Sequence, residues 1–285
     1  MFNKVFLFNT NMLKCKPHSN TRCLSGISDN KESNIEMLKN LFKQYDRPKN
    51  YDALLEKHPK LKKLTKASVL VPISIKEIKK ENSLEYETFY TLTQRTPNLK
   101  FYGGQICFIG GKMDPVDNGN AVETALREAK EEVNVSLERL TILAQMHPLI
   151  ITNVGNDSFL LYPIIAFYDN ANFSPDLNRD EVECLYELPT KRFLSSENHE
   201  LSHVELTNIE YHLHYFNDII NNNEITIWSI TALISIIVSS ILHNRAPAFE
   251  IDPIVQLNPN NVNQFFDDFV LKSTKLLDHF HRPKY

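Results

Sequence analysis

Three glutamates lie close together in the sequence: Glu128, Glu131 and Glu132. They stand at positions i, i+3 and i+4, and on a helix this spacing projects three carboxylates from one patch about one turn long. Like charges placed in this way repel one another, but a divalent cation would convert the repulsion into coordination. Carboxylate oxygens suit Mg²⁺ or Mn²⁺ better than zinc. The pattern therefore predicts a site for one of these two ions, and Arg127 is spaced to form an ion pair with Glu131.

The stretch 120–133 is predicted to be the helix that carries these glutamates. Its apolar side chains recur at helical spacing and form a stripe for the core: Val122, Ala125, Leu126, Ala129 and Val133. Asn134 follows directly, and asparagine suits the left-handed conformation that often ends a helix. A charged helix face that is merely exposed to solvent is the alternative interpretation of the glutamates.

Glycine is concentrated just before this helix. The chain has only 7 glycines, and five of them lie between residues 103 and 119. The pair Gly110 and Gly111 follows a short apolar segment, 105–108, and a turn at this pair would bring backbone carbonyls and amides to a metal ion or a phosphate. The glycines therefore favour a ligand site in front of the helix.

The composition is that of a globular protein and excludes a disordered, collagenous or coiled-coil chain. Of the 285 residues, 42% are hydrophobic and 23% are charged, and 31 basic against 35 acidic residues give a net charge of −4. Because this balance does not support nucleic-acid binding by electrostatics alone, we expect no nucleic-acid partner. The four cysteines show no C-x-x-C spacing, which argues against a disulfide framework and a zinc site.

The first 25 residues differ from the rest of the chain. They hold four basic residues and no acidic one, so residues 1–25 carry a charge of +4 and the remainder −8. This composition is typical of a mitochondrial transit peptide and predicts a mitochondrial location. A cytoplasmic location, or a peroxisomal one without a C-terminal signal, is the alternative. The uncharged stretch 226–242 has isoleucines at helical spacing among serines and threonines, so we expect a buried helix and no stable membrane insertion.

The other patterns predict a mixture of helices and strands. Besides 120–133, helices are expected at 34–45, where Ser33 and Glu36 form a capping-box pattern, and at 51–57, 224–243 and 262–280. Strands are expected at 67–75, 85–93, 140–151, 157–168, 183–188 and 211–216. Because the two kinds of element mix without strict alternation, we predict an α+β fold or an α/β/α sandwich.

Residues 111–135, which read GKMDPVDNGNAVETALREAKEEVNV, resemble the Nudix box, G-x5-E-x7-R-E-U-x-E-E-x-G-U, where U is aliphatic. The half R-E-U-x-E-E is intact. Asp117 replaces the first glutamate and is separated from Arg127 by nine residues rather than seven, so 118–120 looks like a loop insertion and Asp117 receives no role by register. Asn134 replaces the late glycine. The resemblance implies the Nudix fold, an α/β/α sandwich with a mixed sheet, and extra helices would lie at both ends of the chain.

The flanks are similar to the coenzyme A diphosphatase branch of the Nudix hydrolases. Residues 91–111 match the spacing of its pattern L-L-T-x-R-[SA]-x3-R-x3-G-x3-F-P-G-G, and the substitutions are Thr91, Thr96, Lys100 and Ile109. Lysine at position 100 keeps the charge but loses bidentate phosphate recognition. The whole resemblance covers roughly 65–245. It implies a Nudix domain there, between helical extensions at 26–64 and 246–285.

The resemblance also implies roles for single residues. Mg²⁺ or Mn²⁺ would be held by the three glutamates and by the backbone of the glycine pair, chiefly Gly111. Glu131 or Glu128 would act as the general base, and Arg127 would orient the carboxylates. The substrate would contact three further residues: Arg95, Lys100 and Gly110.

The reaction implied is hydrolysis of the diphosphate bond of coenzyme A or an acyl-CoA, which gives adenosine 3′,5′-bisphosphate and 4′-phosphopantetheine or its acyl form. Hydrolysis of another nucleoside diphosphate derivative, such as NADH, a nucleotide sugar or a dinucleoside polyphosphate, is the first alternative. A Nudix-fold module that binds without turnover is the second. The sequence leaves open whether the chain forms a homodimer.

Overall fold

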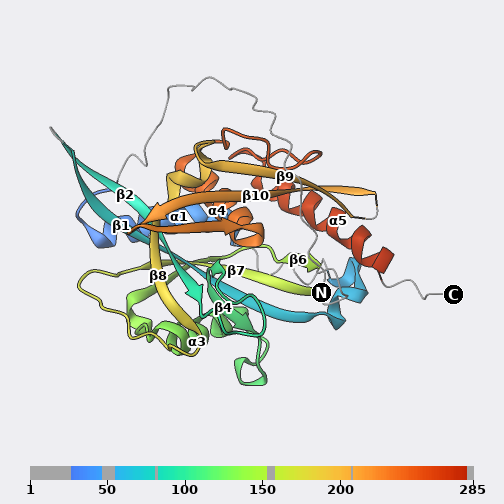
Figure 1. Cartoon of the computed structure of the whole chain (residues 1–285), viewed down its shortest axis with the longest axis horizontal. Coiled ribbons are helices and arrows are strands. Elements are labelled where there is room, and N and C mark those ends of the chain that lie inside the picture. Colours follow the sequence, from blue (N-terminus) through green and yellow to red (C-terminus); the bar gives the residue numbers. More distant parts are fainter. Residues whose placement is uncertain (1–26, 47–54, 81–82, 153–157, 207, 281–285) are drawn as a thin grey trace.

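The computed structural model describes residues 27–46, 55–80, 83–152, 158–206 and 208–280 (Figure 1). The predicted transit peptide, 1–25, lies outside the described residues. So do residues 51–54 of the helix expected at 51–57, while residues 55–57 are helical.

A mixed eight-stranded sheet forms the centre of the molecule. Its strands are β1 (Thr65–Lys80), β2 (Ser83–Arg95), β3 (Ile106–Cys107), β4 (Ile109–Lys112), β5 (Leu140–Gln145), β6 (Leu149–Thr152), β7 (Ser158–Tyr168) and β8 (Val182–Pro189). β1 pairs with β7 in parallel and with β2 and β4 in antiparallel orientation. β2 also pairs with β3 and β8, and β7 with β5 and β6. The expected mixed sheet is confirmed.

Helices cover both faces of this sheet. α3 (Ala121–Val133) lies on one face, and α4 (Ser229–His243) and α1 (Lys31–Phe42) lie on the other (Figure 1). Along β7, successive side chains alternate between the two apolar clusters, with Leu160 and Tyr162 on the α3 side and Leu161 and Ile165 on the α4 side. Because both faces are buried, this strand is a continuous apolar run in the sequence. The α/β/α sandwich is therefore confirmed.

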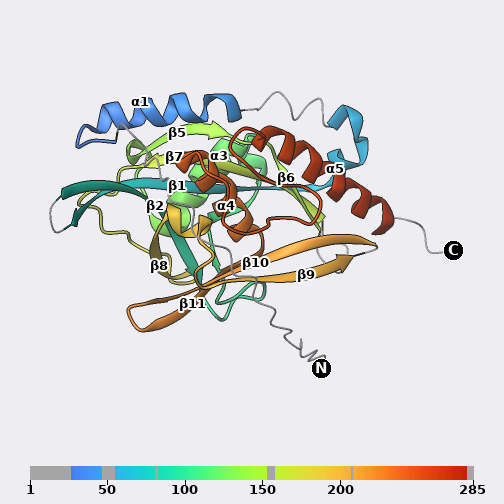
Figure 2. The ribbon, with the colours of Figure 1, turned by 90° about the horizontal axis from the view of Figure 1, so that it is seen from above.

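A second, three-stranded sheet lies beside the first (Figure 2). It consists of β9 (His199–Leu206), β10 (Ile209–Ile220) and β11 (Asn223–Trp228), all antiparallel. The helix expected at 224–243 starts only at Ser229, so the prediction was wrong for 224–228. Ile225 and Ile227 are buried on one side of β11, and this two-residue alternation overrides the helical pattern.

The first and the last long helix that the structure describes, α1 and α5, both contribute to the core. α1 begins at Lys31 rather than 34, because the Asn30 side chain caps it by accepting a hydrogen bond of 2.8 Å from the Ser33 N–H. Leu38 and Phe42 of this helix are fully buried. At the other end, α5 (Val262–Phe280) forms as predicted and packs against β6.

The strand expected at 140–151 is divided at 146–148 into β5 and β6.

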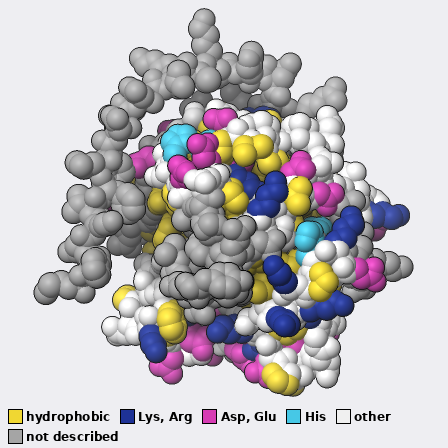
Figure 3. Space-filling model, turned by 90° about the vertical axis from the view of Figure 1, so that its right-hand side faces the viewer, with side chains coloured by type: hydrophobic (Ala, Val, Ile, Leu, Met, Phe, Trp, Pro, Cys, Tyr) yellow, Lys and Arg dark blue, Asp and Glu magenta, His cyan; other side chains and the backbone are white. Residues whose placement is uncertain are grey.

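Within the part of the chain that the structure describes, no helix is long and apolar enough to cross a membrane. On the face shown in Figure 3, basic, acidic and apolar side chains are interspersed.

Candidate active site

Asparagines define both ends of the helix that carries the glutamates. The Asn120 side chain accepts a hydrogen bond of 3.0 Å from the Val122 N–H and caps the N-terminus of α3. Asn134 ends the helix in the left-handed conformation, with φ of 53°. The helix predicted at 120–133 is therefore confirmed to within one residue.

The glycine pair lies inside a strand rather than in a turn, so that expectation was wrong. Gly110 and Gly111 belong to β4 and pair with Val69 and Ser68 of β1. This strand passes so close to α3 that a Cβ on Gly111 would lie 2.7 Å from Cδ of Glu128. A side chain at 111 would therefore displace the Glu128 carboxylate, which occupies the space next to this glycine.

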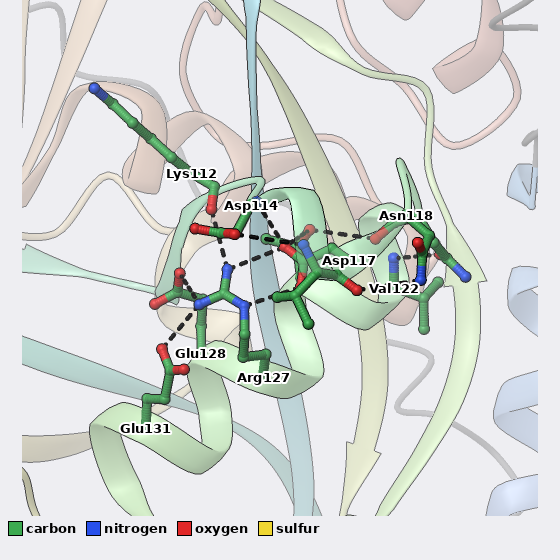
Figure 4. A network of polar contacts seen from close by, with 11 residues as sticks. Lys112, Asp114, Asp117, Asn118, Val122, Arg127, Glu128 and Glu131 are labelled. Carbon is green, nitrogen blue, oxygen red and sulfur yellow. Dashed lines mark hydrogen bonds and ion pairs between the residues drawn. The ribbon is translucent and has the colours of Figure 1, made fainter.

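Arg127 is the centre of the polar network that faces this strand (Figure 4). Its Nε donates to Asp117 Oδ1 at 2.9 Å, and Nη2 donates to Asp117 Oδ2 and to the Lys112 carbonyl, both at 3.1 Å. Nη1 lies 2.8 Å from Glu131 Oε2 and 2.9 Å from Glu128 Oε1. A guanidinium has five N–H donors, and here each has an acceptor. Arg127 is therefore bound to three carboxylates, among them Glu131 at the predicted i, i+4 spacing, and has no donor left for a reacting group.

Asp117 anchors Arg127 and is the residue that sequence reasoning missed. Its carboxylate is 3% exposed and also accepts bonds of 2.9 Å from the Thr124 hydroxyl and 2.8 Å from the Asp114 N–H. The Arg127 guanidinium lowers the pKa of Asp117 to about 2. The inserted residues do not prevent this contact, because Asn118 and Gly119 both adopt positive φ and fold the loop back before Asn120 caps the helix. The short spacing Asp114 to Asp117, which forms a capping box in the structure, was the available signal.

Glu128 and Glu132 form a buried pair of carboxyl groups on the face of α3 that contacts β4. Glu128 is 9% exposed and Glu132 3%. Burial raises the pKa of both, and the negative charge of Glu128 adds to the effect on Glu132, whose pKa is raised to about 8. The Gly110 N–H hydrogen-bonds to Glu132. In this structure a backbone group of the glycine pair, the Gly110 N–H, is thus directed at Glu132.

Glu131 does not join the buried pair. Its side chain is 53% exposed and is bound to Arg127. Within the described residues, no three His, Cys, Asp or Glu side chains converge on one point, so the predicted convergence of all three glutamates is not found. Glu131 is 60° from Glu128 and 100° from Glu132 around a helix of about 100° per residue, which places it at the rim of the buried face.

The donor set nevertheless fits a divalent cation of the magnesium type. Two carboxyl groups share a buried site, burial raises the cost of ionising both, and the charge of Glu128 adds to that cost for Glu132. A hard cation bound to their oxygens would remove that cost, and Mg²⁺ completes its shell with water and substrate phosphates. Glu128 and Glu132 are thus suited to be ligands, with Glu131 next to them at the surface.

Arg95 lies beside this pair and Lys100 lies further out. The positive charge of Arg95, the last residue of β2, acts on Glu132, and its Nε is buried without a hydrogen-bond partner in the described part of the chain. Lys100 is exposed in the loop after β2, with its ammonium 5.3 Å from the centre of the Phe101 ring. Glu181, which the sequence did not single out, is a further carboxylate whose charge acts on Glu128 and Glu132.

Comparisons with known proteins identify the family of this chain. A model of the NUDIX domain matches residues 85–206. The peroxisomal coenzyme A diphosphatase NUDT7 of Mus musculus is 30% identical over 189 residues, which are 66% of this chain and 74% of that protein. Nudix hydrolase 15, mitochondrial, of Arabidopsis thaliana is 30% identical over 159 residues, which are 55% of this chain and 54% of that protein. Among solved structures, the Nudix hydrolase RenU of M. smegmatis has a TM-score of 0.34 and 17% identity, and the match covers 44% of this chain and 71% of that one.

The chain belongs to the Nudix hydrolase family. Enzymes of this family act on small nucleotide substrates and generally use divalent cations such as Mg²⁺ or Mn²⁺, in agreement with the carboxylate site on α3.

Proposed function

We propose that this protein hydrolyses the diphosphate bond of coenzyme A or an acyl-CoA, releasing adenosine 3′,5′-bisphosphate and 4′-phosphopantetheine or its acyl form. The observation that carries diphosphate hydrolysis is the buried pair Glu128 and Glu132, held against β4 next to an Arg127 anchored by Asp117. The similarity to a coenzyme A diphosphatase and the pattern at 91–111 support the choice of substrate.

In this mechanism Glu128 and Glu132 would hold Mg²⁺ or Mn²⁺, and Glu131 and the Gly111 backbone would be the protein's further ligands. When bound, the cation neutralises charge on the diphosphate and lowers the pKa of a coordinated water. Water adds to one phosphorus, the bond from that phosphorus to the bridging oxygen breaks, and the leaving phosphate takes the electron pair.

The other residues of the site accept the proton of the attacking water or position the substrate. Glu128 or Glu131 accepts the proton of the attacking water, since both carboxylates contact the same Nη1 of Arg127 and are held by it. Arg95, with its unpartnered Nε beside Glu132, and the exposed Lys100 contact the substrate's phosphates. Gly110 acts through its backbone at the same edge.

The test uses the purified full chain with coenzyme A and either Mg²⁺ or Mn²⁺, and mass spectrometry identifies the products. Glu132→Gln is expected to lower kcat by at least about 10²-fold, as for loss of one charged group that stabilises the transition state. Glu123→Gln is the matched control, because Glu123 is an exposed glutamate in the first turn of the same helix. Turnover of NADH or a dinucleotide but not of coenzyme A or acyl-CoA would discard the proposed substrate, and a near-normal Glu132→Gln rate would refute the site.

We also propose that the protein acts in mitochondria. The basic, acid-free composition of residues 1–25 supports this, as does the mitochondrial assignment in the name of one relative. A fluorescent protein fused to the C-terminus should colocalise with a mitochondrial marker, and removal of residues 1–25 should abolish the colocalisation. Peroxisomal or cytoplasmic fluorescence of the full chain would contradict the proposal.

A further inference from the structure

The loop 96–105, which joins β2 to β3, carries two neighbouring aromatic side chains into solvent. Phe101 is 64% exposed and Tyr102 52%. Large aromatic rings gain free energy when they are buried, and adjacent exposed ones are a common feature of recognition surfaces. The position of these rings relative to the candidate active site therefore matters.

The loop is held rigidly. The Gly104 N–H donates to the Arg95 carbonyl at 3.0 Å, and the Arg95 N–H donates to the Gln105 carbonyl at 2.9 Å. On the other side, the Thr96 N–H donates to the Glu181 carbonyl at 2.9 Å. A Cβ on Gly103 would lie 3.0 Å from the Leu99 carbonyl oxygen, which shows how tightly the loop is folded. A rigid loop presents its side chains with little loss of conformational entropy on binding.

Tyr102 is in a left-handed conformation, with φ of 57°. This conformation is unfavourable for a residue that has a Cβ, and strained residues of this kind cluster at ligand-binding sites. Glycine would adopt it without strain, and Gly103 and Gly104 follow immediately in the chain. A bulky aromatic residue here is not explained by the backbone, which points to a use for the ring.

The loop leads outward from the carboxylates. Arg95, which begins it, lies beside Glu132, and Lys100 lies over the Phe101 ring at 5.3 Å from its centre. Along the chain, the loop thus runs from a guanidinium beside the buried carboxylates to an exposed ammonium and two exposed aromatic rings. This sequence of groups matches a nucleotide whose diphosphate is at the carboxylates and whose base is at the end of the loop.

We propose that Phe101 and Tyr102 form a stacking platform for the nucleobase of the substrate. The proposal rests on the proposed function, because it requires a nucleotide at the site. Bases of any identity stack on aromatic side chains, so the platform would fix the orientation of the base and would contribute to binding rather than to the bond-breaking step.

The experiment measures binding by calorimetry in Mg²⁺, with adenosine 3′,5′-bisphosphate as the probe that has a base and inorganic pyrophosphate as the probe that lacks one. Phe101→Ala is expected to weaken binding of the first about ten-fold, or about 1.4 kcal/mol, and to leave pyrophosphate unchanged. Phe101→Trp should retain the affinity, and Tyr102→Gly, which relieves the strained φ, should lower it although the fold gains stability. Ile219→Ala, at an exposed apolar residue of the β10–β11 hairpin, is the matched control.

An unchanged affinity of Phe101→Ala for adenosine 3′,5′-bisphosphate would overturn the platform, and so would an equal loss for both probes. Because these measurements need no turnover, the platform and the proposed reaction can fail separately. Base-dependent binding without hydrolysis of any diphosphate would refute the reaction alone. Diphosphate hydrolysis by the wild type, together with an unchanged affinity of Phe101→Ala for adenosine 3′,5′-bisphosphate, would refute the platform alone.

Discussion

Replacement of Asp117 by asparagine tests whether this buried carboxylate organises the site. The asparagine side chain has the same shape, but one of its two positions becomes an NH₂ donor. Among the residues that the structure describes, Oδ2 accepts from Thr124, Asp114 and Arg127, whereas Oδ1 accepts only from Arg127 Nε. The amide will therefore turn its NH₂ group toward Nε, which leaves two donors facing each other and the guanidinium without its buried counter-charge.

The expected loss of unfolding free energy is about 2–4 kcal/mol. A hydrogen bond to a charged group contributes about 1.5–3 kcal/mol, and removal of one partner of a buried ion pair costs about 3–5 kcal/mol. Taken together, the two ranges span about 1.5–5 kcal/mol. We expect a loss below the top of that span, because the Arg127 side chain is 22% exposed and its charge is therefore only partly removed from water. The kcat for diphosphate hydrolysis should fall about 10–100-fold, as for the loss of a residue that orients a metal ligand.

Urea unfolding at neutral pH measures the first quantity and steady-state hydrolysis the second. A double-mutant cycle with Arg127→Gln separates the pair from other effects, and the two losses should be far from additive. The pKa of Asp117 is lowered, so its charge contributes stability that is present above pH about 4 and lost as the pH falls through about 2. The difference between wild type and Asp117→Asn should shrink over that window. Equal stability of the two proteins at pH 7, or losses that simply add, would refute the reasoning.

Three further substitutions probe other parts of the molecule. Gly111→Ala should leave urea stability nearly unchanged, because the flexible end of Glu128 can move aside, but it should lower kcat strongly; a normal rate would contradict the close approach. Burial lowers the pKa of His214 to about 4, so this residue alone should cost the protein about 3 kcal/mol of stability as the pH falls from 6.5 to 4, since only the unfolded chain binds that proton; burial also lowers the pKa of His199 and His243, which adds to the slope. His214→Gln should flatten this part of the stability profile, and an equally steep profile would exclude His214 as its source. Asn134→Gly should raise the melting temperature and Asn134→Ala should lower it, because position 134 has a φ of 53°; the reverse order would refute the capping argument.

The sequence predicted those elements whose local pattern and tertiary surroundings agree. The helix 120–133 has an apolar stripe and an asparagine at each end, so its bounds could be predicted closely. By contrast, β9 is rich in polar residues, and its backbone pairs with β10 with His203 opposite His212, so no regular apolar alternation marks it. β11 was hidden because its isoleucines also fit a helical stripe, and only the pairing with β10 decides between the two periods.

At the site, the sequence predicted which residues are present but not which of them are buried together and which lies at the surface. Helical spacing put three glutamates on one patch, yet burial against β4 selects Glu128 and Glu132, and Arg127 holds Glu131 at the surface. That selection depends on where the strand lies, which no spacing within the helix encodes. Glu181 comes from a segment far away in the sequence and is brought near only by the fold.

Asp117 shows that the number of residues between two positions predicts a contact less well than the backbone conformation of the loop that joins them. Two additional residues before a helix would move an anchoring side chain by several ångströms if the connection were extended, since each residue spans about 3.3–3.6 Å. Here Asn118 and Gly119 both take positive φ, so the additional length turns back on itself, and Asn120 still caps the helix. Arg127 therefore binds a carboxylate even though Asp117 is separated from it by nine residues rather than the seven of the Nudix box. Insertions in such a loop should be tolerated whenever residues able to adopt positive φ accompany them, because what the site requires is a buried acceptor pair facing the guanidinium.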